Sequence, residues 1–204
     1  MSIFKKIDRA VRQEMEEQKH HYKPESIDEL EEATAFTRQE LKILYRGFKE
    51  NCPNGYVTKE KFLAIFEEFF CIGDSDIYAE MVFNTFDHDN NKRISFREFV
   101  EALSILLRGT PEEKLSWIFD LYDQNQTGFI TKKEVLRVMM GMYSMMGENA
   151  SPPIKAQDVL DHVADVFSKL DRNRDGRISR QEFVDGGLAD RHITSSFDLF
   201  YTVW

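Results

Sequence analysis

The chain of 204 residues has 36 acidic and 27 basic side chains, which give a formal net charge of −9 and an isoelectric point near 5.1. This balance disfavours nucleic acid as a partner, because binding to a polyphosphate begins with positive potential. Two cysteines, Cys52 and Cys71, cannot build a disulfide framework and fit a reducing cytosol. The chain has no apolar run of membrane-spanning length and no apolar segment typical of a signal peptide, so we expect a cytoplasmic protein.

The N-terminal extension, residues 1–30, contains a candidate amphipathic helix. Its apolar residues recur at helical spacing among basic ones. Such a helix could touch an acidic membrane surface, dock on a partner, or be solvated and frayed. Ser2 follows Met1 where N-myristoylation needs glycine, so we expect no myristoyl anchor. The apolar residues are Ile3, Phe4, Ile7 and Val11, and the basic ones are Lys5, Lys6, Arg9 and Arg12.

Residues 50–61 have the outline of a twelve-residue calcium loop but lack its ligands. Gly55 stands at position 6, where such a loop turns sharply. Cys52 occupies position 3, however, and Lys61 places a cation at position 12, where calcium needs a bidentate carboxylate. Pro53 also stiffens the turn. We predict that this first unit keeps the helix–loop–helix shape and binds no metal.

Three later segments carry oxygen ligands in the order that calcium requires: residues 87–98, 123–134 and 171–182. Each offers side-chain oxygens at positions 1, 3 and 5, a backbone carbonyl at position 7, and a glutamate at position 12. Calcium takes six to eight such oxygens at about 2.3–2.6 Å, so we predict up to three bound Ca²⁺. A single match could be a solvated acidic turn, but three matches between amphipathic stretches indicate metal binding. The predicted ligands are Asp87, Asp89, Asn91, Arg93, Glu98, Asp123, Asn125, Thr127, Phe129, Glu134, Asp171, Asn173, Asp175, Arg177 and Glu182.

The three metal loops are not equivalent. The fourth loop, residues 171–182, has three carboxylates around Gly176 and is predicted to be the strongest site. The third loop has two carboxylates and should attract calcium less. The second has three, but Lys92 occupies its glycine position, and a left-handed residue with a Cβ costs about 1–2 kcal/mol. We expect the second site to be the weakest, or the least selective against Mg²⁺.

Apolar residues between the loops recur with a helical period, and Thr-x-x-Glu capping boxes at Thr37 and Thr110 mark helix starts. A Ser/Thr-x-x-Glu signature also closes each metal loop, so its glutamate should bind metal at the start of the exit helix. Residues 108–111 break the chain between the second and third units. We predict an all-α fold of four EF-hand helix–loop–helix units in two lobes. The expected parts are an N-terminal extension (1–30), an N-terminal pair (31–108), a C-terminal pair (109–189) and a C-terminal amphipathic helix (190–204).

Two apolar features favour a sensor over a buffer, because a sensor needs an apolar surface whose exposure depends on metal. Five of the eight methionines lie between Met139 and Met146, and flexible Met side chains suit a surface that accommodates a partner helix. The alternative is ordinary core packing. The stripe between Phe197 and Trp204 has helical spacing, and it is either permanent core or a plug that a partner helix displaces.

The stretches LYRGFKENCPNG, FVEALSILLRGTPEEKLSWIFDLYD and MMGMYSMMG, together with one ligand-free loop and three metal loops, resemble the neuronal calcium sensor family. Within it, the likeness is greatest to the Kv-channel-interacting protein (calsenilin) branch and covers about residues 30 to 204. The resemblance implies a cytosolic auxiliary subunit of a Shal-type voltage-gated potassium channel. The channel's N-terminal helix would enter an apolar groove and displace the C-terminal helix. Ser2 suits that branch, whereas Glu98 closes a loop whose last residue is often altered there.

Four functions remain open from the sequence. The leading hypothesis is a calcium-responsive channel subunit that reaches the inner face of the plasma membrane through its partner. A general sensor for another membrane-associated target, such as a receptor kinase or cyclase, is the second. A calcium-released DNA-binding repressor is the third, although no basic stripe favours it, and a pure buffer is the fourth. An enzyme is not expected, because no nucleophile–base set is evident and protein ligands should close each metal loop.

Overall fold

The computed structural model describes residues 26–69, 76–146 and 156–190. The predicted N-terminal helix and the aromatic C-terminal stripe lie outside these residues. Within the described part, no helix combines the length and the apolar character needed to cross a membrane.

The described chain is mostly helical, which confirms the expected all-α class. Nine helices and four three-residue strands lie in the described ranges. The elements are α2 (Ile27–Ala33), α3 (Arg38–Asn51), β1 (Tyr56–Thr58), α4 (Lys59–Phe69), α5 (Asp76–Phe86), β2 (Arg93–Ser95), α6 (Phe96–Arg108), α7 (Pro111–Tyr122), β3 (Phe129–Thr131), α8 (Lys132–Met146), α9 (Ala156–Leu170), β4 (Arg177–Ser179) and α10 (Arg180–Ala189).

The capping boxes predicted at Thr37 and Thr110 are confirmed as the N-caps of α3 and α7. The Thr37 N–H donates to a carboxylate oxygen of Glu40 over 2.9 Å, and the Thr37 hydroxyl accepts from the Glu40 N–H. In α7, Pro111 follows the cap, where its fixed φ suits the first helical turn and its missing N–H costs no helical hydrogen bond. Local sequence therefore sets where both helices begin.

Short antiparallel strands join the loops in pairs, a feature that the sequence analysis did not predict. Val57 of β1 lies opposite Ile94 of β2, and Ile130 of β3 lies opposite Ile178 of β4. These β-branched residues stand at position 8 of their loops, and all four are buried. The first loop is thereby tied to the second, and the third loop is tied to the fourth.

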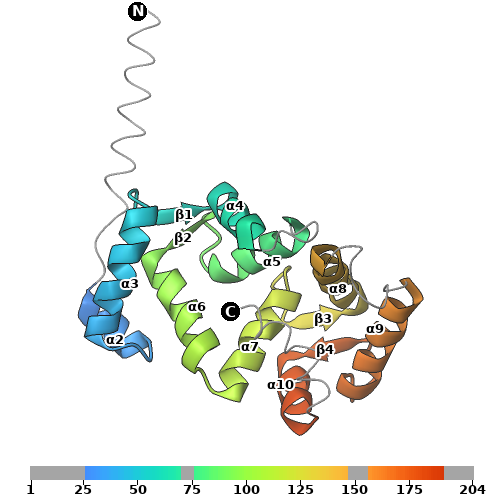
Figure 1. The fold of residues 1–204 in the computed structure, drawn as a ribbon. Helices are drawn as coiled ribbons and strands as arrows, with labels where there is room; N and C mark the ends of the chain where they lie inside the picture. The colour runs from blue at the N-terminus through green and yellow to red at the C-terminus, as the bar shows by residue number, and fades with distance from the viewer. Residues whose placement is uncertain (1–25, 70–75, 147–155, 191–204) are drawn as a thin grey trace, which may run out of the picture.

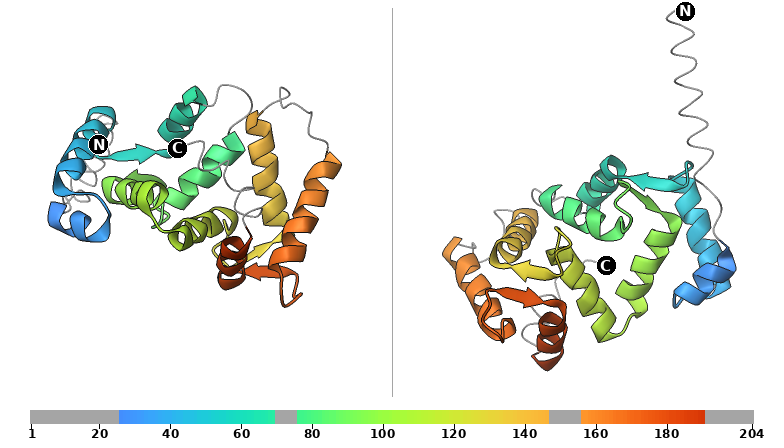
Figure 2. Two further views of the ribbon diagram at one scale, coloured as in Figure 1. Left: turned by 60° about the horizontal axis from the view of Figure 1, so that its bottom comes forward. Right: turned by 180° about the vertical axis from the view of Figure 1, so that it is seen from behind.

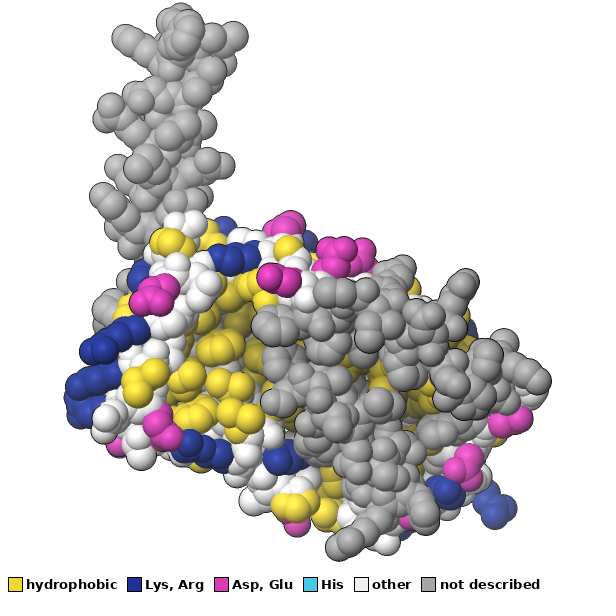
Figure 3. Space-filling model, in the orientation of Figure 1, with side chains coloured by type: hydrophobic (Ala, Val, Ile, Leu, Met, Phe, Trp, Pro, Cys, Tyr) yellow, Lys and Arg dark blue, Asp and Glu magenta, His cyan; other side chains and the backbone are white. Residues whose placement is uncertain are grey.

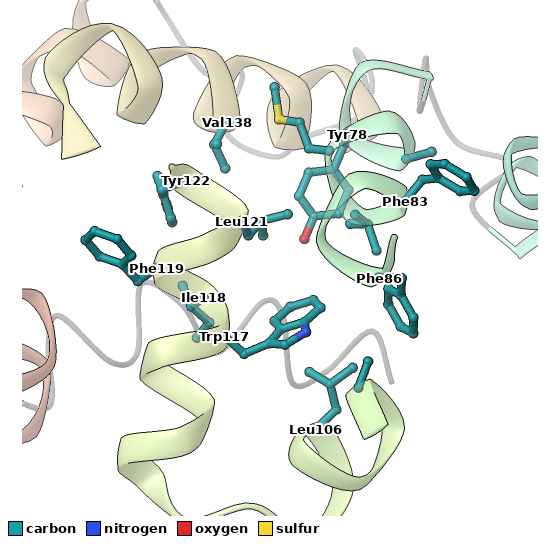
Figure 4. Packing of buried hydrophobic residues seen from close by; sticks show 14 of the residues in the cluster. Tyr78, Phe83, Phe86, Leu106, Trp117, Ile118, Phe119, Leu121, Tyr122 and Val138 are labelled. Atoms are coloured by element: carbon teal, nitrogen blue, oxygen red, sulfur yellow. The ribbon is translucent and has the colours of Figure 1, made fainter. Parts of the chain in front are cut away.

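Helix α5 connects the two ends of the molecule. Figure 1 shows α2–α6 at one end and α7–α10 at the other, and the views in Figure 2 agree. Helix α5 packs against both α7 and α8. The ring of Phe86 meets that of Trp117 edge-to-face at 6.0 Å (Figure 4), and a Cβ placed at Gly141 in α8 would lie only 3.4 Å from the Cβ of Tyr78. The amide of Asn84 also donates to the amide oxygen of Gln124 over 3.0 Å.

The methionine cluster divides between core and surface. Met139 and Met142 are buried, whereas Met140 is 56 % exposed. The side chains of Met145 and Met146 lie outside the described part of the chain. Core packing thus accounts for two of these methionines, and one faces solvent.

The close approach of α10 to α7 makes a first prediction. A Cβ at Gly187 would lie 2.8 and 3.0 Å from both terminal carbons of the buried Leu115, whereas a Cβ at Gly47 in α3 would meet nothing within 4 Å. We expect Gly187→Ala to lower the free energy of unfolding by about 1–3 kcal/mol through overpacking. Gly47→Ala is the matched control and should raise it by about 0.5–1 kcal/mol through helix propensity. Urea denaturation measures both, and a stabilised Gly187→Ala protein would contradict the packing seen here.

The end of α6 is held to the start of α3 by an ion pair, which makes a prediction about acid. The Arg108 guanidinium donates to both carboxylate oxygens of Glu40 and, with the N–H and hydroxyl of Thr37, lowers the pKa of Glu40 from 4.5 to about 2. Because the folded pKa lies below the unfolded one, this contribution is present above pH 4.5 and is lost as the pH falls toward 2. Glu40→Gln and Arg108→Gln should therefore both flatten the fall of unfolding free energy between these pH values. Unchanged slopes in acid denaturation of both variants would refute this assignment.

Candidate metal centres

The aspartate at position 1 organises each predicted metal loop. Its two carboxylate oxygens accept the backbone N–H groups of positions 5 and 6, which folds the loop around the carboxylate. Asp87 and Asp123 are 3 % and 4 % exposed, and Asp171 is half-buried. The donors and distances are Asn91 (3.0 Å) and Lys92 (2.8 Å) to Asp87, Thr127 (2.9 Å) and Gly128 (2.7 Å) to Asp123, and Asp175 (3.1 Å) and Gly176 (3.0 Å) to Asp171.

Left-handed backbone recurs at two positions of each predicted metal loop. Position 6 has positive φ in all of them, and Lys92, at +64°, confirms the expected left-handed residue with a Cβ. Position 4 is also left-handed, which the sequence analysis missed because Asn90, Gln126 and Arg174 share no residue type. The proline ring fixes φ near −65°, so Pro53 at position 4 prevents the first loop from adopting this conformation.

The closing glutamate of each metal loop divides its oxygens between two tasks. In the second loop, one oxygen of Glu98 accepts the N–H and the hydroxyl of Ser95, both at 2.8 Å, and so caps α6. The other oxygen faces into the loop, 3.4 Å from the N–H of Asp89. Glu134 and Glu182 cap their helices in the same way, through Thr131 and Ser179. A cation bound in the loop would therefore be attached directly to the first turn of the exit helix.

In the second loop, Asp87, Asp89 and Glu98 each offer a carboxylate oxygen, and these oxygens all lie within 4.8 Å of one another. Burial raises the pKa of Asp87, and the N–H groups of Lys92 and Asn91 oppose this rise only in part. Three like charges so close together favour a divalent cation, and an all-oxygen donor set suits Ca²⁺ or Mg²⁺. These residues fit the predicted ion.

The third loop brings its predicted ligands around a hydroxyl. The Thr127 hydroxyl lies 3.1 Å from a carboxylate oxygen of Asp123 and 3.0 Å from the carbonyl of Phe129. Asn125 donates from its side-chain amide to Glu134 over 3.1 Å. With Asp123 and Glu134 both buried, the loop offers carboxylate, amide, hydroxyl and carbonyl oxygens. The two carboxylates give the loop two negative charges, and the loop fits a hard cation.

The fourth loop is bound together by its own backbone donors. Asn173 accepts the Asp175 N–H over 2.9 Å, and Asp175 accepts the Arg177 N–H over 2.9 Å. Burial would raise the pKa of Glu182, but hydrogen bonds from Ser179 and from the N–H of Asn173 lower it overall. Among the described residues, the close convergence of three carboxylates occurs in the second loop and not in the fourth. The predicted ranking of the sites stays a prediction.

Lysine ammonium groups bind backbone carbonyls in the first loop. Lys61, at position 12, donates to the carbonyl of Asn51, and Lys49 donates to that of Pro53 over 2.7 Å. Sequence reasoning identified Lys61 as a missing ligand but could not foresee these contacts, which depend on how the loop closes. Ammonium groups of the protein itself thus bind the loop, which is a physical reason for the predicted absence of metal.

Residues 112–186 match the family model of an EF-hand domain pair. The match runs from the first turn of α7 into α10 and contains both the third and fourth loops. This part of the chain is an EF-hand pair, which is consistent with a calcium-binding EF-hand protein. EF-hand proteins of this kind bind calcium through such loops and typically act as regulators rather than enzymes.

The strain at Lys92 makes a prediction for the second site. In a Glu134→Gln/Glu182→Gln background that isolates this site, Lys92→Gly should tighten Ca²⁺ binding about ten-fold, because glycine removes a left-handed cost of about 1–2 kcal/mol. Lys92→Met is the matched control, since it removes the charge but keeps the Cβ. Competition with a calcium chelator measures both affinities. Equal affinities in the two variants would assign the effect to charge alone.

Proposed function

We propose that this protein is a calcium sensor that regulates a target protein by binding an amphipathic helix of that target. The observation that carries the proposal is the double use of the closing glutamates. Glu98, Glu134 and Glu182 each cap an exit helix with one oxygen and lie in a predicted metal loop. A cation in these loops would act directly on α6, α8 and α10, which is what a sensor requires and a buffer does not.

The apolar surface supports a helical partner. Figure 3 shows hydrophobic side chains gathered in a hollow on one face of the molecule, over α3 and α6. Half-buried hydrophobic residues of these helices include Leu44, Tyr45, Phe99 and Leu103, which pack against the core from its edge. Exposed apolar surface of this kind suits the apolar face of an amphipathic helix.

The identity of the target rests on the resemblance to the Kv-channel-interacting branch. On that basis the partner is the cytoplasmic N-terminal helix of a Shal-type potassium channel. Association with the membrane would then be peripheral and would occur through the channel. The more general alternative is a sensor for another membrane-associated target.

The test is capture of the full-length protein by an immobilised Shal-type channel N-terminal peptide, with Ca²⁺ and with chelator. The control peptide has the same composition but a scrambled apolar face. Retention by the native peptide alone supports the channel role. Failure of folded, calcium-bound protein to bind removes the channel role and leaves the general sensor.

A second measurement separates a sensor from a buffer. A sensor should change its binding of an apolar dye, or the fluorescence of Trp117 and Trp204, when Ca²⁺ is added, because its exit helices move. The Glu98→Gln/Glu134→Gln/Glu182→Gln variant should lose this response. Tight Ca²⁺ binding without either signal would identify a buffer instead.

A further inference from the structure

The helix that follows each loop, its exit helix, begins with a residue that contacts a second helix. This second helix is the one that precedes the paired loop. This residue stands at position 10 of the loop in all four units, and the contacts are of different chemistry. They are Lys59 to Glu80 of α5 (2.6 Å between Nζ and Oε1), Phe96 to Phe48 of α3 (ring centroids 5.3 Å apart), Lys132 over the Phe167 ring of α9 (5.5 Å), and Arg180 to α7.

The Arg180 contact involves the largest number of groups. Its guanidinium donates to the hydroxyl of Ser116 over 2.7 Å and to the carbonyl of Ser116 over 3.1 Å. Its other terminal nitrogen donates to the carboxylate of Asp120, and its Cζ lies 4.4 Å from the centre of the Phe119 ring. A planar guanidinium can make these contacts at once, whereas an ammonium cannot. Arg180 therefore holds one full turn of α7.

Helix α10 is thus attached to α7 at both ends. The guanidinium contact lies at its first residue, and the close approach of Gly187 to Leu115 lies near its last. Glu182, the closing ligand of the fourth loop, is only two residues beyond Arg180 in the same helical turn. A shift of Glu182 toward a bound cation would therefore move Arg180, and through it α7.

Helix α7 joins the third loop at its end and packs on α5 through Trp117. It ends at Tyr122, so the next residue, Asp123, is the first ligand of the third loop. Its Trp117 packs on Phe86 of α5, and the indole N–H is buried with no hydrogen-bond partner among the described residues. Figure 4 shows Trp117 between α7, Phe86 and Leu106. A movement of α7 would change the surroundings of this indole.

We propose that Arg180 is a positioning residue that transmits occupancy of the fourth loop to α7, and hence to the third loop and to the α5 contact. The third and fourth loops are already connected by the β3–β4 pair, and Arg180 adds a second connection through its side chain. The inference rests on calcium binding in these loops, as proposed above. It assigns the coupling to one residue that is not itself a predicted ligand.

The test uses the full chain with Trp204→Phe, Glu98→Gln and Glu134→Gln, so that the fourth loop alone binds and Trp117 alone fluoresces. Adding Ca²⁺ should change the Trp117 emission as one ion binds. Arg180→Met should leave the ion bound, as seen by calorimetry, but lose most of the emission change, because methionine can make neither the hydrogen bonds to Ser116 nor the ion pair with Asp120. Arg180→Lys keeps the charge but not the planar guanidinium, so its emission change should also be smaller than that of the parent protein.

Arg174→Met is the matched control, because it removes the same charge from the same loop at position 4. Arg174→Met should retain the emission change. Asp120→Asn breaks the ion pair from the side of α7 and should reduce the emission change. This variant keeps the test decisive if Arg180→Met fails to fold. An equal response in Arg180→Met and Arg174→Met overturns the inference, and so does an ion bound to the parent without any emission change. Absence of Ca²⁺ binding in the unmutated protein would instead overturn the proposed function.

Discussion

The organisation of this protein depends on the glutamate that closes each predicted metal loop. One carboxylate oxygen accepts the N–H and hydroxyl of the Ser or Thr that caps the exit helix, and the other faces the loop, as Glu98 does. In the second loop, the inward oxygen of Glu98 lies within 4.8 Å of carboxylate oxygens of Asp87 and Asp89, so a bound cation would relieve repulsion among these groups. The same side chain therefore links the electrostatics of the loop to the direction of a helix.

Changes at one loop cannot stay local, because the loops are joined in pairs. The short strands place a buried Ile or Val of one loop opposite that of its partner, and the residue at position 10 adds a side-chain contact to the partner's entering helix. Helix α5 then packs on both helices of the third unit, so it contacts α7 and α8 together. A change in the angle between α7 and α8 must alter at least one of these contacts.

Much of this architecture could be predicted from the sequence because it is specified locally. The ligand spacing, the capping boxes at Thr37 and Thr110 and the left-handed Lys92 each depend on residues a few positions apart. The strand pairing, the α5 contacts and the Arg180 contacts join residues far apart in the chain, and no local pattern encodes them. The carbonyl contact of Lys61 was missed for a related reason, since it appears only once the loop has closed.

The two lysines that bind the first loop have a consequence for the protein without metal. Lys61 and Lys49 are covalently part of the chain, so their contacts with the loop carbonyls do not depend on the concentration of any ion. Strand β1 then keeps its order whether or not calcium is present, and it offers β2 a fixed template. The N-terminal half should therefore be partly ordered before any ion binds, whereas the C-terminal half, whose two loops are both predicted metal loops, has more order to gain.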